Sequence, residues 1–250
     1  FGFKTDSLPS DELVRQTLAR CGMARFTGRT LPSRSSDPLP EGPLPLAGGG
    51  RSFGIGRQTP GSPPFEPSNK PVLNFNAIAQ GYSCDKVAEY LYSIGVKDML
   101  VDIGEIYCDG FNPQGKPWRI GIDRPKDGNN TPGADLDGIW EASSVRRDGK
   151  DGSGRGVVTS GNYRKFYIKD GVKYSHTIDP RTGYPVQHNL LSATIIASTA
   201  MEADAYATYC MVTGEKAAKE FILSRPDIEG YLIYGDFETW ASPGFSLVQK

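Results

Sequence analysis

The stretch LLSATIIASTAMEADAYATYCMVTG, residues 190–214, places an apolar strand pattern directly before a capped helix and decides the fold class. Leu190 to Ala197 form an apolar run of strand length. Thr199 and Glu202 make the Thr-x-x-Glu pattern of a capping box, and Gly214 supplies a stop, so a helix is predicted over 199–213.

The chain around this stretch mixes helices and strands without a strict βαβ repeat. Further helices are expected at 8–22, 83–94 and 215–224, and further strands at 99–103, 118–122, 164–168, 174–178 and 231–234. In the helix over 83–94, Val87, Leu91 and Ile94 are predicted to face inward, with Gly95 as the stop. The Lys169-Asp170-Gly171 step predicts a hairpin turn. The pattern predicts an α+β fold.

The chain divides by composition into residues 1–25 with an N-terminal helix that Ser10 would cap, a Pro/Gly-rich segment over 26–71, and a folded core over 72–250. Nine of the nineteen prolines lie between Pro32 and Pro67. Such a segment buries too little apolar surface to offset its ordering entropy, and it predicts a loop or disorder. A corrupted reading frame is the alternative explanation.

The bulk numbers exclude some function classes. With 28 basic and 29 acidic residues the net charge is −1, which gives no electrostatic case for binding nucleic acid. No apolar run reaches the length of about 18 residues that a transmembrane helix needs. The four cysteines form no Cys-x-x-Cys pair; they are expected to be ordinary small apolar residues, with a disulfide left open.

Asp204 and Thr208 are the first candidates for a functional site. Their spacing of four places a carboxylate and a hydroxyl on the same side of the predicted helix. Oxygen ligands of this kind suit Mg²⁺, with substrate phosphates completing the shell. The alternative is an ordinary solvated helix face.

The run YSHTIDPRTGYPV, residues 174–186, puts His176 beside a constrained turn. A histidine has a pKa suited to base catalysis near neutral pH, although a lone histidine is more often a structural hydrogen-bonding residue. Asp179 is expected to cap its own turn. His188 is expected at the surface.

Two polar segments complete the set of candidates. Asn74 to Tyr82 (NFNAIAQGY) join small residues to a helix start, where backbone amides can face an anion. Thr159 to Arg164 (TSGNYR) are expected to form a polar elbow before a strand, which suits a binding loop or an ordinary turn.

Taken together, these segments resemble the ApbE family of bacterial FAD:protein FMN transferases. The matching segments are NFNAIAQGYSCD (74–85), PWRIGI (117–122), TSGNYR (159–164), SHTIDPRTGYP (175–185) and EADAYAT (202–208). The resemblance implies an α+β, T-fold-like flavin transferase domain. It also implies that Phe1-Gly2-Phe3-Lys4 lie where the family's N-terminal portion ends, so that part of the flavin pocket and any lipoprotein signal are missing.

The resemblance implies a Mg²⁺-dependent transfer of FMN from FAD to a Thr or Ser hydroxyl of a target protein, with release of AMP. Asp204 and Thr208 would hold Mg²⁺ with an oxygen of Ala77, and His176 would be the catalytic base. The FAD site would be lined by Asn74, Gln80 and Ile178; many relatives carry acids or lysine at the first two of these positions.

The implied partners are FAD and an acceptor flavoprotein, such as a subunit of a redox pump or an electron-transfer complex. The implied location is the bacterial periplasm or the outer face of the inner membrane, with a lipid anchor on the parent protein. Two alternatives remain: an FAD pyrophosphatase that gives FMN and AMP, and a flavin-binding protein without turnover.

Overall fold

A computed structural model describes residues 11–18, 74–129, 131–142, 154–163, 166–169 and 172–248. They belong to one unit made of Phe1–Gly22 and Asn74–Lys250. The Pro/Gly-rich segment predicted over 26–71 and the predicted cap Ser10 lie outside the described residues. The described part of the predicted first helix is α1, Asp11–Leu18.

The centre of the fold is a six-stranded antiparallel sheet with the order β1-β2-β5-β8-β9-β10. Its strands are β1 (Met99–Asp102), β2 (Ile106–Asp109), β5 (Arg155–Gly161), β8 (Leu190–Ala197), β9 (Glu229–Tyr234) and β10 (Glu238–Ala241). The 3-10 helix η2 (Gly235–Phe237) joins the last two. A three-stranded sheet has the order β11-β4-β3, with β3 at Arg119–Asp123, β4 at Leu136–Glu141 and β11 at Leu247–Val248.

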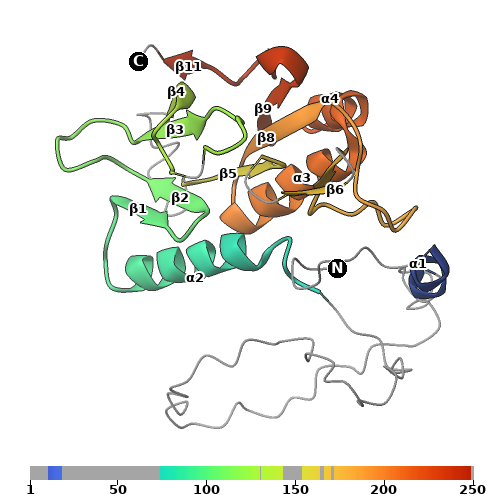
Figure 1. Cartoon of the computed structure of the whole chain (residues 1–250). Coiled ribbons are helices and arrows are strands. Elements are labelled where there is room, and N and C mark those ends of the chain that lie inside the picture. Colours follow the sequence, from blue (N-terminus) through green and yellow to red (C-terminus); the bar gives the residue numbers. More distant parts are fainter. Residues whose placement is uncertain are drawn as a thin grey trace, which may run out of the picture. The chain divides into compact units, whose positions relative to one another are not determined.

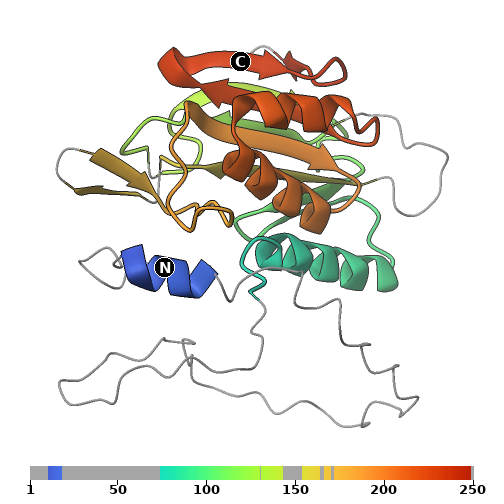
Figure 2. The same ribbon diagram turned by 90° about the vertical axis from the view of Figure 1, so that its right-hand side faces the viewer.

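Both faces of the large sheet are covered, which explains why β8 is buried almost throughout. Alternate residues of β8 point to opposite faces. Ile195 packs with helices α3 (Ala200–Thr213) and α4 (Glu215–Leu223), whereas Ile196 packs with Ile122 and Trp140 of the small sheet. Figures 1 and 2 show α3 and α4 side by side over one face of the sheet.

The helix α2 (Ala79–Ser93) packs against β1, β2 and the start of α3. It begins four residues before the predicted Ser83. Its inward residues include Cys84 and Ala88, whereas Val87 and Ile94 are exposed, so the predicted inward face was wrong for these two. The predicted stop is confirmed: Gly95 has φ +87, and its N–H donates to the Tyr92 carbonyl at 2.9 Å.

The stretch 190–214 folds as predicted. β8 covers Leu190–Ala197, and the Thr199 hydroxyl accepts the Glu202 N–H at 3.1 Å at the start of α3. Gly214, with φ 81, ends that helix. The predicted hairpin is also present, because Lys169 of β6 (Phe166–Lys169) pairs with Val172 of β7 (Val172–Ser175). The α+β class is confirmed.

Several elements escaped prediction, namely β2, β4, β5, β10 and β11. The predicted polar elbow over 159–164 is wrong at its start, since Thr159 to Gly161 belong to β5, where Thr159 and Thr194 pair through their hydroxyls at 2.8 Å. Cys84, Cys108 and Cys210 are buried and free. Within the described ranges no helix has both the length and the apolar character needed to cross a membrane.

Candidate functional site

Asp204 is the buried carboxylate of α3, with 5% of its surface exposed. Its Oδ2 accepts the N–H of Gly81 at 3.1 Å. Burial raises the pKa of this carboxyl, and the hydrogen bond from Gly81 opposes that shift. Because a carboxylate offers about four acceptor positions, one amide leaves most of its capacity unused.

The Gly81 amide belongs to the first turn of α2, where N–H groups have no carbonyl partner inside the helix. It donates to Asp204. Among the hydrogen bonds of the described residues, none ends on the carbonyl of Ala77, four residues earlier. The contact between α2 and α3 at this point is the Gly81–Asp204 hydrogen bond, and Ala77, whose carbonyl is a predicted ligand, lies two residues before α2.

Thr208 lies one turn after Asp204 on α3, on the same side of the helix as the spacing predicts. The Asp204 carboxylate, the Thr208 hydroxyl and the Ala77 carbonyl all offer oxygen atoms, which are the ligands that Mg²⁺ takes. The described part of the chain holds no group of three or more His, Cys, Asp or Glu residues that could bind a metal. The donor set, and a buried carboxylate with unused acceptor capacity, fit Mg²⁺ with substrate oxygens as its remaining ligands.

Gly81 allows α2 and α3 to touch. A Cβ atom at Gly81 would lie 2.3 Å from the Ala200 carbonyl oxygen and 2.8 Å from the Met201 Cα. Gly156 of β5 is just as close on another side, because its Cβ would lie 2.3 Å from the Thr199 carbonyl oxygen. The start of α3 is thus held between two backbones that carry no side chain at the point of contact.

Asp85 is a residue of this region to which sequence reasoning gave no role. Its Oδ1 accepts the Ala200 N–H at 2.8 Å and its Oδ2 accepts the Met201 N–H at 2.9 Å. Burial raises the pKa of this carboxyl, and the two backbone hydrogen bonds oppose the shift. Its signals in the sequence are its place at the end of the matching segment 74–85 and its position one turn after Gly81 on the same side of α2.

The histidine turn follows β7. His176 is exposed there, and Ile178 forms an isolated bridge with Pro185 across the turn. Asp179 caps its own turn as predicted: its carboxylate accepts the Arg181 N–H at 2.8 Å and pairs with the Arg181 guanidinium at 2.8 Å. The guanidinium holds the pKa of Asp179 below its usual value.

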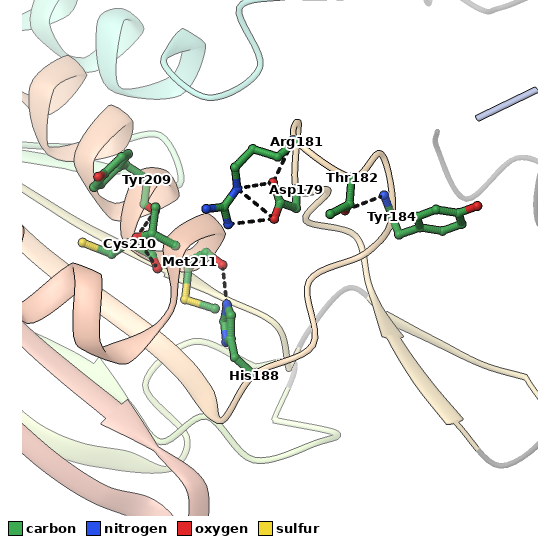
Figure 3. A network of polar contacts seen from close by, with 9 residues as sticks. Asp179, Arg181, Thr182, Tyr184, His188, Tyr209, Cys210 and Met211 are labelled. Atoms are coloured by element: carbon green, nitrogen blue, oxygen red, sulfur yellow. Dashed lines mark hydrogen bonds and ion pairs between the residues drawn. The ribbon is translucent and has the colours of Figure 1, made fainter. Parts of the chain in front are cut away.

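The turn lies beside α3. Figure 3 shows the Arg181 guanidinium reaching from the turn toward the helix that carries Tyr209, the neighbour of Thr208. His188, predicted at the surface, is instead half-buried, and its Nε2 bonds to the Met211 carbonyl at 2.9 Å near the end of α3. Arg181 and His188 place the segment next to the helix of the proposed metal ligands; the role of His176 stays a prediction.

The two predicted flavin contacts at the start of α2 are exposed. The side-chain oxygen of Asn74 accepts the Asn76 N–H at 2.8 Å and shapes the turn before the helix. Gln80 donates from Nε2 to the Ile103 carbonyl at 3.3 Å, which ties the start of α2 to the end of β1. Both residues lie near Ala77 in the sequence, and their contacts with a flavin stay predictions.

Comparison with known proteins gives one consistent result. The model of the ApbE family matches residues 1–232. The FAD:protein FMN transferase of Escherichia coli K12 is 39% identical over 177 residues, which cover 69% of this chain and 46% of that protein. The enzyme of the same name from Haemophilus influenzae is 35% identical over 182 residues, covering 71% of this chain and 49% of that protein.

Solved structures agree with these relatives. The apo form of the flavinyl transferase ApbE from Pseudomonas stutzeri has a TM-score of 0.54 and 35% identity, covering 68% of this chain and 49% of that chain. The ApbE protein of Thermotoga maritima has a TM-score of 0.57 and 27% identity, covering 68% and 51%. The chain thus spans about half the length of the relatives it matches.

Proposed function

The chain belongs to the ApbE family, and on this premise we propose that it acts in Mg²⁺-dependent transfer of FMN from FAD to a Thr or Ser hydroxyl of a target protein, with release of AMP. The observation that carries the proposal is the buried Asp204 carboxylate, held by the Gly81 amide at the first turn of α2. The relatives named FAD:protein FMN transferase support the reaction type.

Asp204, Thr208 and the Ala77 carbonyl would hold Mg²⁺ in this proposal. When bound, the cation supplies charge neutralisation at the diphosphate and alignment of the phosphoryl group. The burial of Asp204 favours cation binding, because a counter-charge offsets the desolvation of the carboxylate.

His176 would act as the base. The acceptor hydroxyl oxygen forms a bond to the phosphorus of the FMN half, the bond from that phosphorus to the AMP oxygen breaks, and the hydroxyl proton passes to the imidazole. The Asp179–Arg181 pair and the Ile178–Pro185 bridge would hold the turn from which His176 acts. The flavin would contact Asn74, Gln80 and Ile178.

The test is incubation of the protein with FAD, Mg²⁺ and a flavin-acceptor domain, followed by intact-mass spectrometry of the acceptor and chromatography of the nucleotides. A covalent FMN adduct with AMP release is expected. Free AMP without an adduct would indicate an FAD pyrophosphatase instead, and unchanged FAD would indicate a binding protein without turnover.

Asp204→Asn sharpens the test, since it keeps the shape of the side chain and removes the charge that would bind Mg²⁺. Transfer is expected to fall by at least about 10²-fold. Asp236→Asn is the matched control, because Asp236 is an exposed carboxylate on the β9–β10 turn with φ 55, a conformation that asparagine tolerates. Full Mg²⁺-dependent activity of Asp204→Asn would refute the ligand assignment.

A further inference from the structure

Two helices of the candidate site are joined by carboxylates that point in opposite directions. Asp85 of α2 accepts the N–H groups of Ala200 and Met201 at 2.8 and 2.9 Å. Asp204 of α3 accepts the Gly81 N–H of α2 at 3.1 Å. Each helix therefore contributes a carboxylate to the amides of the first turn of the other.

The spacing of these residues couples the Asp85 hydrogen bonds to the Asp204 hydrogen bond. Gly81 and Asp85 lie one turn apart on α2, and Ala200 and Asp204 lie one turn apart on α3. Between these two sets of hydrogen bonds the backbones of α2 and α3 are in contact, since no side chain fits at Gly81 against the Ala200 carbonyl. A shift of α3 along α2 that lengthened the Asp85 bonds would also move Asp204 away from Gly81.

The helix α3 has a cap of its own apart from Asp85. The Thr199 hydroxyl accepts the Glu202 N–H at 3.1 Å, and the Ala203 N–H donates to the Thr199 carbonyl at 3.1 Å. Asp85 binds the two amides that precede these. Because a carboxylate bound to backbone amides makes strong, directional hydrogen bonds, Asp85 fixes the place of α3 against α2 in addition to closing its first turn.

We propose that Asp85 is a positioning residue for the candidate metal site: by holding the start of α3, it sets where the Asp204 carboxylate stands relative to Gly81 and the Ala77 carbonyl. The part of this inference that concerns Mg²⁺ rests on the proposed function. The part that concerns Asp204 and Gly81 does not, and the two parts are measured separately.

Amide hydrogen exchange by NMR on the full chain without metal tests the first part. In Asp85→Asn the amides of Ala200 and Met201 are expected to lose protection, and so is Gly81, which Asp85 does not bind. A weakened cap of about 1 kcal/mol corresponds to a roughly fivefold faster exchange. Unchanged protection at Gly81 would overturn the proposal and leave Asp85 as a local cap.

Three further variants make the result specific. Thr199→Ala removes the cap that belongs to α3, so the Glu202 amide is expected to lose protection from exchange while the Gly81 amide changes little. An equal loss of protection at the Gly81 amide would also overturn the proposal. Glu89→Gln is the matched charge control, one turn after Asp85 and ion-paired with Lys86. Asp85→Glu keeps the charge one methylene further out and gives a milder variant, with a smaller loss at Gly81 expected.

Calorimetric titration with Mg²⁺ alone tests the second part. Asp85→Asn is expected to bind the cation on the order of tenfold more weakly than wild type, the loss typical of a residue that orients a metal ligand. Glu89→Gln is expected to match wild type. If wild type takes up no Mg²⁺ alone, the part of the inference that concerns the cation is refuted, while exchange at Gly81 still decides whether Asp85 positions Asp204.

Discussion

Replacing Gly81 by alanine would add one methyl group at the contact between α2 and α3. Its Cβ would lie 2.3 Å from the Ala200 carbonyl oxygen, 2.6 Å from the Ala200 carbonyl carbon and 2.8 Å from the Met201 Cα. All three neighbours are backbone atoms, so no side-chain rotation relieves the clash. An ordinary carbon–oxygen contact is about 3.4 Å, so the helices would have to separate by about 1 Å.

Two free-energy terms of opposite sign decide the effect of Gly81→Ala on stability. Alanine favours a helix interior over glycine by about 1 kcal/mol. Overpacking of a tight contact costs typically about 1–3 kcal/mol, and the backbone neighbours place this site at the upper end. The net loss is then about 2 kcal/mol, which lowers the Tm of a domain of this size by about 4–8 °C.

Activity is expected to fall further than stability does, because a displacement of about 1 Å in a positioned group can cost about 10²-fold in rate. The assays are thermal denaturation by circular dichroism and FMN transfer to the acceptor domain. Ser83→Ala, an exposed change two residues further along the helix, is the control and should match wild type in both. A Tm equal to or above that of wild type would refute the close contact and leave only the helix-propensity gain.

Three other perturbations test the turn and the core. His176→Asn should slow transfer by about 10²–10⁴-fold while FAD affinity, read by flavin fluorescence, stays near that of wild type; an unchanged rate removes His176 from catalysis. Asp179→Asn should keep most activity because it retains the acceptor for the Arg181 N–H, whereas Asp179→Ala should lose more; equal rates for the two would show that this hydrogen bond does not shape the turn. Burial raises the pKa of the Cys84 thiol to about 11 and that of Cys108 to about 12. Because these thiols lose their protons at a lower pH in the unfolded chain than in the folded one, the free energy of unfolding, measured with urea, should fall as the pH rises above about 9. A Cys84→Ala variant should show a shallower fall.

The sequence predicts the elements whose signals are local. Leu190 to Ala197 form an apolar run, and Thr199 with Gly214 marks both ends of the next helix, so β8 and α3 were found with their bounds. β5 was not predicted because one of its residues is set by a contact with a segment that is distant in the sequence. Gly156 interrupts the strand pattern, and its reason is the Thr199 carbonyl that packs on it.

The predicted start of α2, at residue 83, was wrong for a similar reason. A glycine near a helix start indicates a break when it is considered alone, and the helix was predicted to begin after it. In the fold, Gly81 is the point at which α3 approaches α2. The inward face was misassigned as well, because both exposed positions, Val87 and Ile94, carry apolar side chains.

The residues of the candidate site also differ in whether local sequence signals could predict them. The spacing of Asp204 and Thr208 is a local fact, and their shared helix is confirmed. The resemblance, and not the residue pattern, supplied Ala77. Asp85 could not be assigned because its partners are backbone amides of another helix, which the sequence does not identify.

The hydrogen bond between Gly81 and Asp204 joins positions 123 residues apart. Strands β2, β5 and β8 lie between them in the chain and pair over long sequence separations, so a long stretch of chain has to close before the site is complete. Such long-range closure is a late and slow event in folding. A cation at this site could not guide early folding, but by binding only the native state it would add about 2.7 kcal/mol of stability at one hundred times its Kd. Protection from proteolysis by Mg²⁺ would then report that a newly made chain has completed its fold.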